Sequence, residues 1–180
     1  MTGNERRALL SLARESVYAA STGGKLPEIP DVKIFNESGG AFVTLKSRGR
    51  LRGCIGHFAG LGTLGETVRA MAREAAVGDP RFTAVTPEEV VDLVIEISVL
   101  SPMEKISPEE VMTGIHGLFV RRGFRSGTLL PQVASEEGWD REAFLTHTCL
   151  KAGLPGNAWL DRETELLAYT AEVFSETTDN

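Results

Sequence analysis

The 180-residue sequence is poor in cysteine and histidine, and it contains no long apolar run. Its two cysteines, Cys54 and Cys149, are too few for the disulfide framework of a small secreted protein. No stretch reaches the roughly 20 apolar residues of a membrane span, and the charged N-terminal segment lacks the apolar centre of a signal peptide. These absences predict a protein of the reducing cytoplasm that does not enter the membrane.

Basic residues are also scarce, with 19 Lys and Arg against 25 Asp and Glu and a formal net charge of -6. General nucleic-acid binding needs clustered cations that neutralise phosphates, so this composition disfavours a nucleic-acid partner. The exception is a run of four cations, Lys46, Arg48, Arg50 and Arg52. Two interpretations of this run remain open, a solvated hairpin tip or a local site for an anionic small molecule.

Hydrophobic periodicity, capping signals and turn residues divide the chain into short helices and strands. The pattern predicts helices over 4–21, 64–77, 131–137 and 140–152, hairpins over 41–46 with 50–55 and over 116–122 with 125–130, and single strands over 91–100 and 164–175. The order hairpin, helix, strand therefore occurs twice. We predict an α+β fold whose mainly antiparallel sheet is built from two such halves, with flanking helices and a duplication as the origin. The alternative is an ordinary α+β meander. No linker separates the halves, which predicts one domain over 1–180 with two intertwined sub-structures.

The most unusual segment is Leu51-Arg52-Gly53-Cys54-Ile55-Gly56. Alternation along a strand would place Arg52 and Cys54 on one face and Leu51 and Ile55 on the other, toward the core. Glycine within a strand marks a bulge or a close approach, so Gly53 and Gly56 could clear space beside the thiol. A nearby cation raises the thiolate fraction of a cysteine. The segment is therefore either a reactive cysteine in an anion-binding cleft or a small buried strand residue.

Possible partners for the Cys54 thiol are His57, three residues along, and His147, on the predicted helix 140–152. Cys149 lies on the core face of that helix. A zinc site made of these two cysteines and two histidines is disfavoured, because His147 and Cys149 point in nearly opposite directions on a helix. We therefore predict no zinc site from these residues. Arg81, in Asp79-Pro80-Arg81-Phe82, could bind an anion or pair with Asp79.

The ordered motifs resemble the AMMECR domain family over nearly the whole chain. They are Gly-Ala-Phe-Val-Thr-Leu at 40–45, the Leu51–Gly56 segment, Asp-Pro-Arg-Phe at 79–82, Glu-Ile-Ser-Val-Leu at 96–100, His-Gly-Leu at 116–118, Leu-Leu-Pro-Gln-Val-Ala at 129–134 and Lys-Ala-Gly-Leu-Pro at 151–155. The resemblance implies an α+β fold with two sub-structures. It also implies a functional core at Leu51–Gly56, no metal or cofactor for the domain itself, and an association with a Memo-type protein and a radical SAM protein.

Two hypotheses of function follow. The first is a small enzyme or enzyme component with an anionic small-molecule ligand. Its predicted catalytic residues are Cys54 and His147, and its predicted ligand-binding residues are Arg52, Gly53, Gly56, Arg81 and Gln132. The second is a binding module without chemistry of its own that docks on a Memo-type or radical SAM partner. Its candidate anchors are Phe58, Phe124 and Trp159, which are either exposed or part of the core.

Overall fold

The computed structural model describes residues 1–177 and separates the chain into two compact units. Unit 1 comprises Met1–Leu100 and the segment that begins at Glu172, and unit 2 comprises Ser101–Ala171. Each unit contains an antiparallel four-stranded sheet and its own helices, so the predicted α+β class is confirmed. The chain leaves unit 1, completes unit 2 and then returns to unit 1, so unit 1 is discontinuous in sequence.

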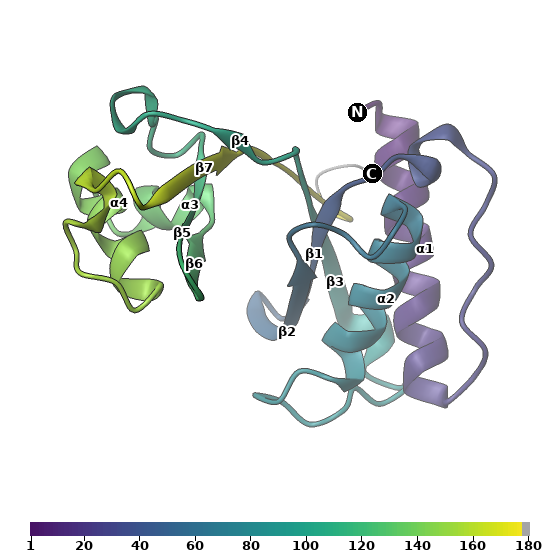
Figure 1. Cartoon of the computed structure of the whole chain (residues 1–180). Helices are drawn as coiled ribbons and strands as arrows, with labels where there is room; N and C mark the ends of the chain where they lie inside the picture. Colours follow the sequence, from purple (N-terminus) through teal and green to yellow (C-terminus); the bar gives the residue numbers. More distant parts are fainter. Residues whose placement is uncertain (178–180) are drawn as a thin grey trace. The chain divides into compact units, whose positions relative to one another are not determined.

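Unit 1 packs two helices on one face of its sheet (Figure 1). Its elements are α1 (Gly3–Thr22), η1 (Lys33–Asn36), β1 (Gly40–Ser47), β2 (Arg50–His57), α2 (Leu64–Val77), η2 (Val90–Asp92), β3 (Leu93–Leu100) and β8 (Ala171–Ser175). The strand order is β2-β1-β3-β8, which makes β2 an edge strand. Capping boxes at Thr2 and Thr63 start the two helices. The inward face of the sheet, with Val43 and Ile95 fully buried, forms the core with these helices.

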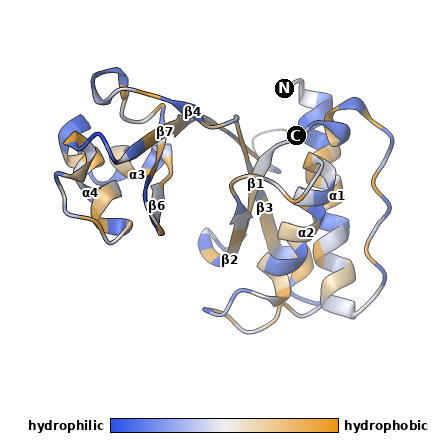
Figure 2. Ribbon diagram, viewed as in Figure 1, coloured by the Kyte–Doolittle hydropathy of each residue, from blue (hydrophilic) through white to orange (hydrophobic). Residues whose placement is uncertain are grey.

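Unit 2 also combines a four-stranded sheet with helices, and most of its helices and strands are shorter than those of unit 1. Its elements are β4 (Glu104–Lys105), η3 (Pro108–Glu110), β5 (Gly117–Arg122), β6 (Arg125–Leu129), α3 (Pro131–Glu136), α4 (Arg141–Lys151), η4 (Ala158–Leu160) and β7 (Glu165–Tyr169). The core joins β5 and β7 to α4 through Val120, Leu166 and Leu145. Figure 2 colours much of β3 in unit 1 and parts of α4 in unit 2 as hydrophobic, as expected for elements that line a core.

The two sheets have the same order of corresponding strands. Unit 1 reads β2-β1-β3-β8, and unit 2 reads β6-β5-β7-β4 from its own hairpin edge. In both units the outer hairpin strand carries a glycine against the end of a helix. A Cβ on Gly53 would lie 2.1 Å from the carbonyl oxygen of Ala75, and one on Gly127 would lie 2.5 Å from the backbone nitrogen of Ala152. This correspondence agrees with the two repeated halves predicted from the sequence.

The predicted strand over 164–175 is wrong in one respect, because it consists of two strands in different sheets. β7 ends at Tyr169 and joins the sheet of unit 2, and β8 begins at Ala171 and joins the sheet of unit 1. Thr170 lies between them, where its backbone oxygen accepts a hydrogen bond from the Ser101 N–H and its own N–H donates to Ser101 Oγ, both at 2.9 Å. The uninterrupted β-forming sequence concealed this break.

Candidate functional site

Cys54 lies on the edge strand β2, and its side chain belongs to the sheet face opposite the helices. The thiol is half-buried and accepts a hydrogen bond from the Thr44 hydroxyl at 3.2 Å. Thr44 pairs with Cys54 on one side and with Glu96 of β3 on the other, so a thiol, a hydroxyl and a carboxylate form one row across three strands. The Lys46 ammonium lies 2.8 Å from Glu96. We call these four residues the outer-face row.

The backbone of Cys54 is held by the Asp79-Pro80-Arg81 turn. Its N–H donates to Asp79 Oδ2 at 2.9 Å, and its carbonyl oxygen accepts from the Arg81 guanidinium at 3.1 Å. Arg81 also donates to both oxygens of Asp79, at 3.0 and 2.7 Å. The hydrogen bonds from Arg81, together with the backbone N–H of Cys54, hold the pKa of the buried Asp79 carboxyl well below its usual range. Of the two roles predicted for Arg81, the structure shows the pairing with Asp79.

The two glycines beside Cys54 do not leave empty space. A Cβ on Gly53 would meet the backbone of α2 at Ala75, and a Cβ on Gly56 would lie 2.1 Å from the Phe42 ring. The prediction that these glycines clear space for a ligand is therefore wrong, because atoms of the chain itself fill that space. Gly53 allows α2 to approach the edge strand, and Gly56 accommodates an aromatic ring from β1.

The alternation predicted for Leu51–Ile55 is broken by a bulge. Leu45 pairs with Gly53 and Lys46 pairs with Leu51, which leaves Arg52 without a partner on β1. Leu51 is consequently 44% exposed and not in the core, contrary to the prediction. The Arg52 guanidinium forms two hydrogen bonds of 3.0 Å with the Glu89 carboxylate and another of 2.9 Å with the Thr83 carbonyl. An anion bound directly by Arg52 would have to compete with Glu89.

Two other cations of the hairpin have side chains that pair with no other described residue. Among residues 1–177, the side chains of Arg48 and Arg50 have no hydrogen-bond or ion-pair partner, although Lys46 and Arg52 do. Arg48 adopts a φ of 50°, which is uncommon for a residue with a side chain. A cavity of about 670 Å³ lies at this tip, lined by Ser47, Arg48, Arg50, Leu51, Arg52, Glu89 and Asp92.

The other predicted site residues belong to unit 2. His147 is exposed on α4 and stacks on Trp139 with ring centroids 4.0 Å apart, and Gln132 lies half-buried on α3. Unit 1 by itself therefore contains Cys54, Arg52 and Arg81 but neither His147 nor Gln132. His57 is exposed at the end of β2. Roles for His147 and Gln132 beside Cys54 stay predictions.

The remaining sequence-based candidates divide by exposure. Cys149 is fully buried in the core of unit 2, as predicted for its helix face. Phe124 is fully exposed at the tip of the β5–β6 hairpin, whereas Phe58 packs edge-on against Phe42 and Trp159 packs against the core.

Within residues 1–177, no three His, Cys, Asp or Glu side chains are grouped in a way that could hold a metal ion. No helix in this part of the chain is both long and apolar enough to cross a membrane.

Sequence reasoning did not group the other three members of the outer-face row with Cys54. Thr44, Glu96 and Lys46 contact one another or Cys54 only because β1 pairs with both neighbours in one particular register. Asp79 was expected only as a possible partner of Arg81, whereas its side chain also holds the Cys54 backbone. The available signal was the polar pattern itself, since Thr44, Lys46 and Glu96 interrupt strands that are otherwise apolar.

Comparison with known proteins identifies the family of this sequence. The AMMECR1 family model matches residues 10–174. The chain belongs to the AMMECR1 family. A protein of Methanothermobacter thermautotrophicus is 41% identical over 98% of this chain and 96% of its own length. A protein of Pyrobaculum arsenaticum is 45% identical over 99% of this chain and 90% of its own length.

A solved structure shares the AMMECR1 fold. The crystal structure of an uncharacterized protein from Pyrococcus horikoshii matches with a TM-score of 0.82 and 43% identity, over 93% of this chain and 89% of that one. The resemblance read from the motifs is therefore confirmed at the level of family and fold. The function has to be argued from the site itself.

Proposed function

We propose that this AMMECR1 protein is a small cytoplasmic enzyme, or a component of one, that binds an anionic small molecule and uses the Cys54 thiol as its reactive group. This proposal rests on the contacts that the residues of the Leu51–Gly56 motif make. Arg52 pairs with Glu89, Gly53 and Gly56 are filled by neighbouring atoms, and the Cys54 backbone is held by Asp79 and Arg81. The Cys54 thiol remains half-exposed, with one hydrogen bond from Thr44.

The environment of the thiol supports a reactive role. The hydrogen bond from the Thr44 hydroxyl holds the sulfur in one position, and the half-buried thiol stays open to a reagent. The charged groups around it are ordered, because the Arg81 guanidinium bonded to the Cys54 carbonyl pairs with Asp79, and the Lys46 ammonium of the outer-face row pairs with Glu96. Cys54 and Cys149 are both free thiols, which suits a reducing compartment.

The test of the thiol is timed alkylation of the native protein with iodoacetamide, read by mass spectrometry. We expect Cys54 to react first, because Cys149 is fully buried. Thr44→Val keeps the shape of the side chain but removes the donated hydrogen bond, so it should slow alkylation of Cys54 several-fold without changing the melting temperature. Cys149 reacting first, or Thr44→Val having no effect on the rate, would contradict the proposal.

The anion is placed at the hairpin tip, near Arg52, because two free guanidinium groups line its cavity. Guanidinium groups bind phosphate and carboxylate through paired hydrogen bonds. We expect inorganic phosphate or citrate to bind wild-type protein and to lose affinity in an Arg48→Gly, Arg50→Gln variant. Glycine suits the positive φ at position 48, so the fold is kept. Arg73→Gln on α2 removes one positive charge elsewhere and serves as the control. Equal affinity in all three proteins would exclude this site.

A second function is favoured by one observation, the complete exposure of Phe124 on the β5–β6 hairpin. A fully exposed aromatic side chain at a turn is a typical anchor for a protein partner. We propose that this anchor serves an accessory role toward a Memo-type or radical SAM protein. Phe124→Ser should then abolish co-purification with that partner, and Val91→Ser, at another exposed apolar side chain, should not.

Cys54→Ser should bind the partner normally yet lose the product of the system. Full product formation by Cys54→Ser would refute the enzymatic role.

A further inference from the structure

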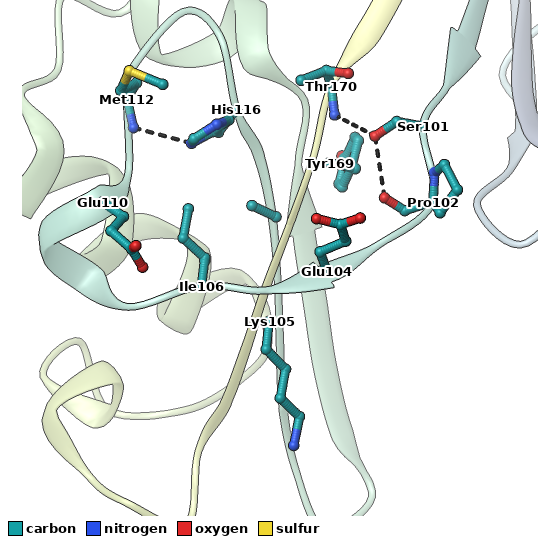
Figure 3. A pocket seen from close by; sticks show the side chains of 11 residues that line it. Ser101, Pro102, Glu104, Lys105, Ile106, Glu110, Met112, His116, Tyr169 and Thr170 are labelled. Carbon is teal, nitrogen blue, oxygen red and sulfur yellow. Dashed lines mark hydrogen bonds between the residues drawn. The ribbon is translucent and has the colours of Figure 1, made fainter.

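Unit 2 contains a cavity that the proposed function does not use. Its volume is about 440 Å³, and its walls come from β4, the segment that follows it and the end of β7 (Figure 3). Every residue that lines it belongs to unit 2. A volume of this size lies within the range of about 300–1,000 Å³ typical of small-molecule pockets.

Two carboxylates and a histidine line the cavity. The Glu104 carboxylate has no hydrogen-bond or ion-pair partner within residues 1–177. Glu110 Oε2 accepts from the N–H and the hydroxyl of Ser107, at 3.0 and 2.8 Å, which leaves Oε1 uncommitted. His116 Nδ1 accepts from the Met112 N–H at 3.2 Å, so the proton of the neutral ring is on Nε2.

Within residues 1–177, no cation pairs with the carboxylates of this cavity. Lys105 is the one described cation that lines it, and Figure 3 shows its side chain directed away from Glu104 and Glu110. The Lys105 ammonium instead lies 4.0 Å from Glu165. The Ser107 hydrogen bonds lower the pKa of Glu110 and keep this carboxyl ionised at neutral pH.

Apolar side chains complete the walls. Ile106 lies between the two glutamates in the close view and Met112 lies beside His116 (Figure 3), and Ala168 also lines the cavity. An anionic ligand would be repelled here, whereas an ammonium group could pair with the partnerless Glu104 carboxylate while its carbon chain covers Ile106. The mixture of apolar walls and a few polar groups is characteristic of small-ligand sites.

We propose that this cavity binds the protonated primary amine of a short aliphatic ligand. Its ammonium group donates to Glu104, Glu110 adds negative charge to the same cavity, and His116 Nε2 faces the ligand as a hydrogen-bond donor. The amine can belong to a small metabolite or to a lysine side chain of a peptide, since both present the same chemistry. The site is independent of Cys54 and of the anion cavity in unit 1.

The test is a titration of the full-length, ¹⁵N-labelled protein with n-butylammonium, followed by amide chemical shifts. We expect shifts at residues 104–116 and 168–170, and none from butyrate, which has the same chain length but the opposite charge. Glu104→Gln should weaken butylammonium binding about tenfold, the effect of losing one charge-assisted hydrogen bond. Glu104 contacts no partner, so this variant keeps its fold.

Glu109→Gln is the matched control, because Glu109 is the exposed neighbour of Glu110 and does not line the cavity. It should leave binding unchanged. An acetylated and amidated Ala-Lys-Ala peptide identifies the source of the amine: tighter binding than butylammonium indicates a protein ligand, and weaker binding a free amine. Equal shifts with butyrate, or equal weakening by Glu104→Gln and Glu109→Gln, would overturn the proposal.

Discussion

Asp79 illustrates how a single carboxylate can organise a candidate site. Edge strands present backbone groups with no neighbouring strand, and on β2 the groups of Cys54 are satisfied by the side chains of Asp79 and Arg81. Because the folded-state pKa of Asp79 is depressed, its ionised form stabilises the folded state. This contribution is complete above the unfolded-state pKa of about 3.9 and is lost as the pH falls toward the folded-state pKa.

We therefore predict that Asp79→Asn lowers the free energy of unfolding at pH 7 by about 1–3 kcal/mol, the cost of weakening buried charge-assisted hydrogen bonds. Urea unfolding between pH 7 and pH 2 would measure it. The difference from wild type should stay constant down to about pH 4.5 and shrink at lower pH. A difference that already declines between pH 7 and pH 5 would assign the effect to another group.

Tyr169 offers a second prediction that rests on one side chain. It is 1% exposed, its ring fills the space over Gly117, and its hydroxyl is bonded to Thr128 at 2.9 Å. Burial raises the pKa of Tyr169 to about 12. The contribution of the neutral Tyr169 side chain to the stability of unit 2 should thus be complete up to the unfolded-state pKa of about 10. It should be lost as the pH rises toward 12. Alkaline absorbance titration should show a step near pH 12 that disappears in Tyr169→Phe. A wild-type profile with no such step would contradict the burial argument.

Single residues were the hardest feature to predict. The sequence identified Cys54 and the Asp79–Arg81 turn separately, because each stands out locally, but local sequence carries no information on which turn meets which strand. Arg52 was predicted to face a ligand beside Cys54, and a bulge redirected it to Glu89. A bulge depends on the pairing of two strands, so alternation within one strand does not reveal it.

Among the elements, the contact between β2 and α2 explains why glycine stands at position 53. We predict that Gly53→Ala lowers the free energy of unfolding by about 1–3 kcal/mol, because the new methyl group would overlap the Ala75 carbonyl, a backbone atom that cannot move freely. Thermal unfolding measures the effect. Gly39→Ala is the control, since a Cβ there meets nothing closer than 3.8 Å. Equal losses in both variants would show that the close approach does not matter.

Elements were predicted more successfully than side-chain contacts. The helix over 64–77 and both hairpins were found with nearly correct bounds, because capping boxes and turn residues are local signals. The two-residue strand β4 was missed, since Glu104-Lys105 has no strand pattern and is ordered by pairing with β7. The break at Thr170 was missed for the converse reason, because a strong local pattern runs through it.

The division into two units predicts how stable separate fragments of the chain should be. Unit 2 is one continuous segment with its own core, and its two ends meet through the Ser101–Thr170 hydrogen bonds. A fragment of residues 101–171 should therefore fold and unfold cooperatively. A fragment of residues 1–100 lacks β8 and the Glu176 carboxylate that pairs with Arg14, so it should be clearly less stable. Circular dichroism during heating distinguishes them, and a fragment 1–100 as stable as unit 1 in the whole chain would refute this view.

The discontinuity of unit 1 also affects how the protein emerges from the ribosome. All of unit 2 is synthesised before β8, the strand that completes the sheet of unit 1. Until then the apolar strand β3 has an unpaired edge, which is the kind of surface that recruits other chains. A nascent chain thus carries one finished unit and one unfinished sheet, and slow translation of the last segment would prolong the interval in which a chaperone must protect it.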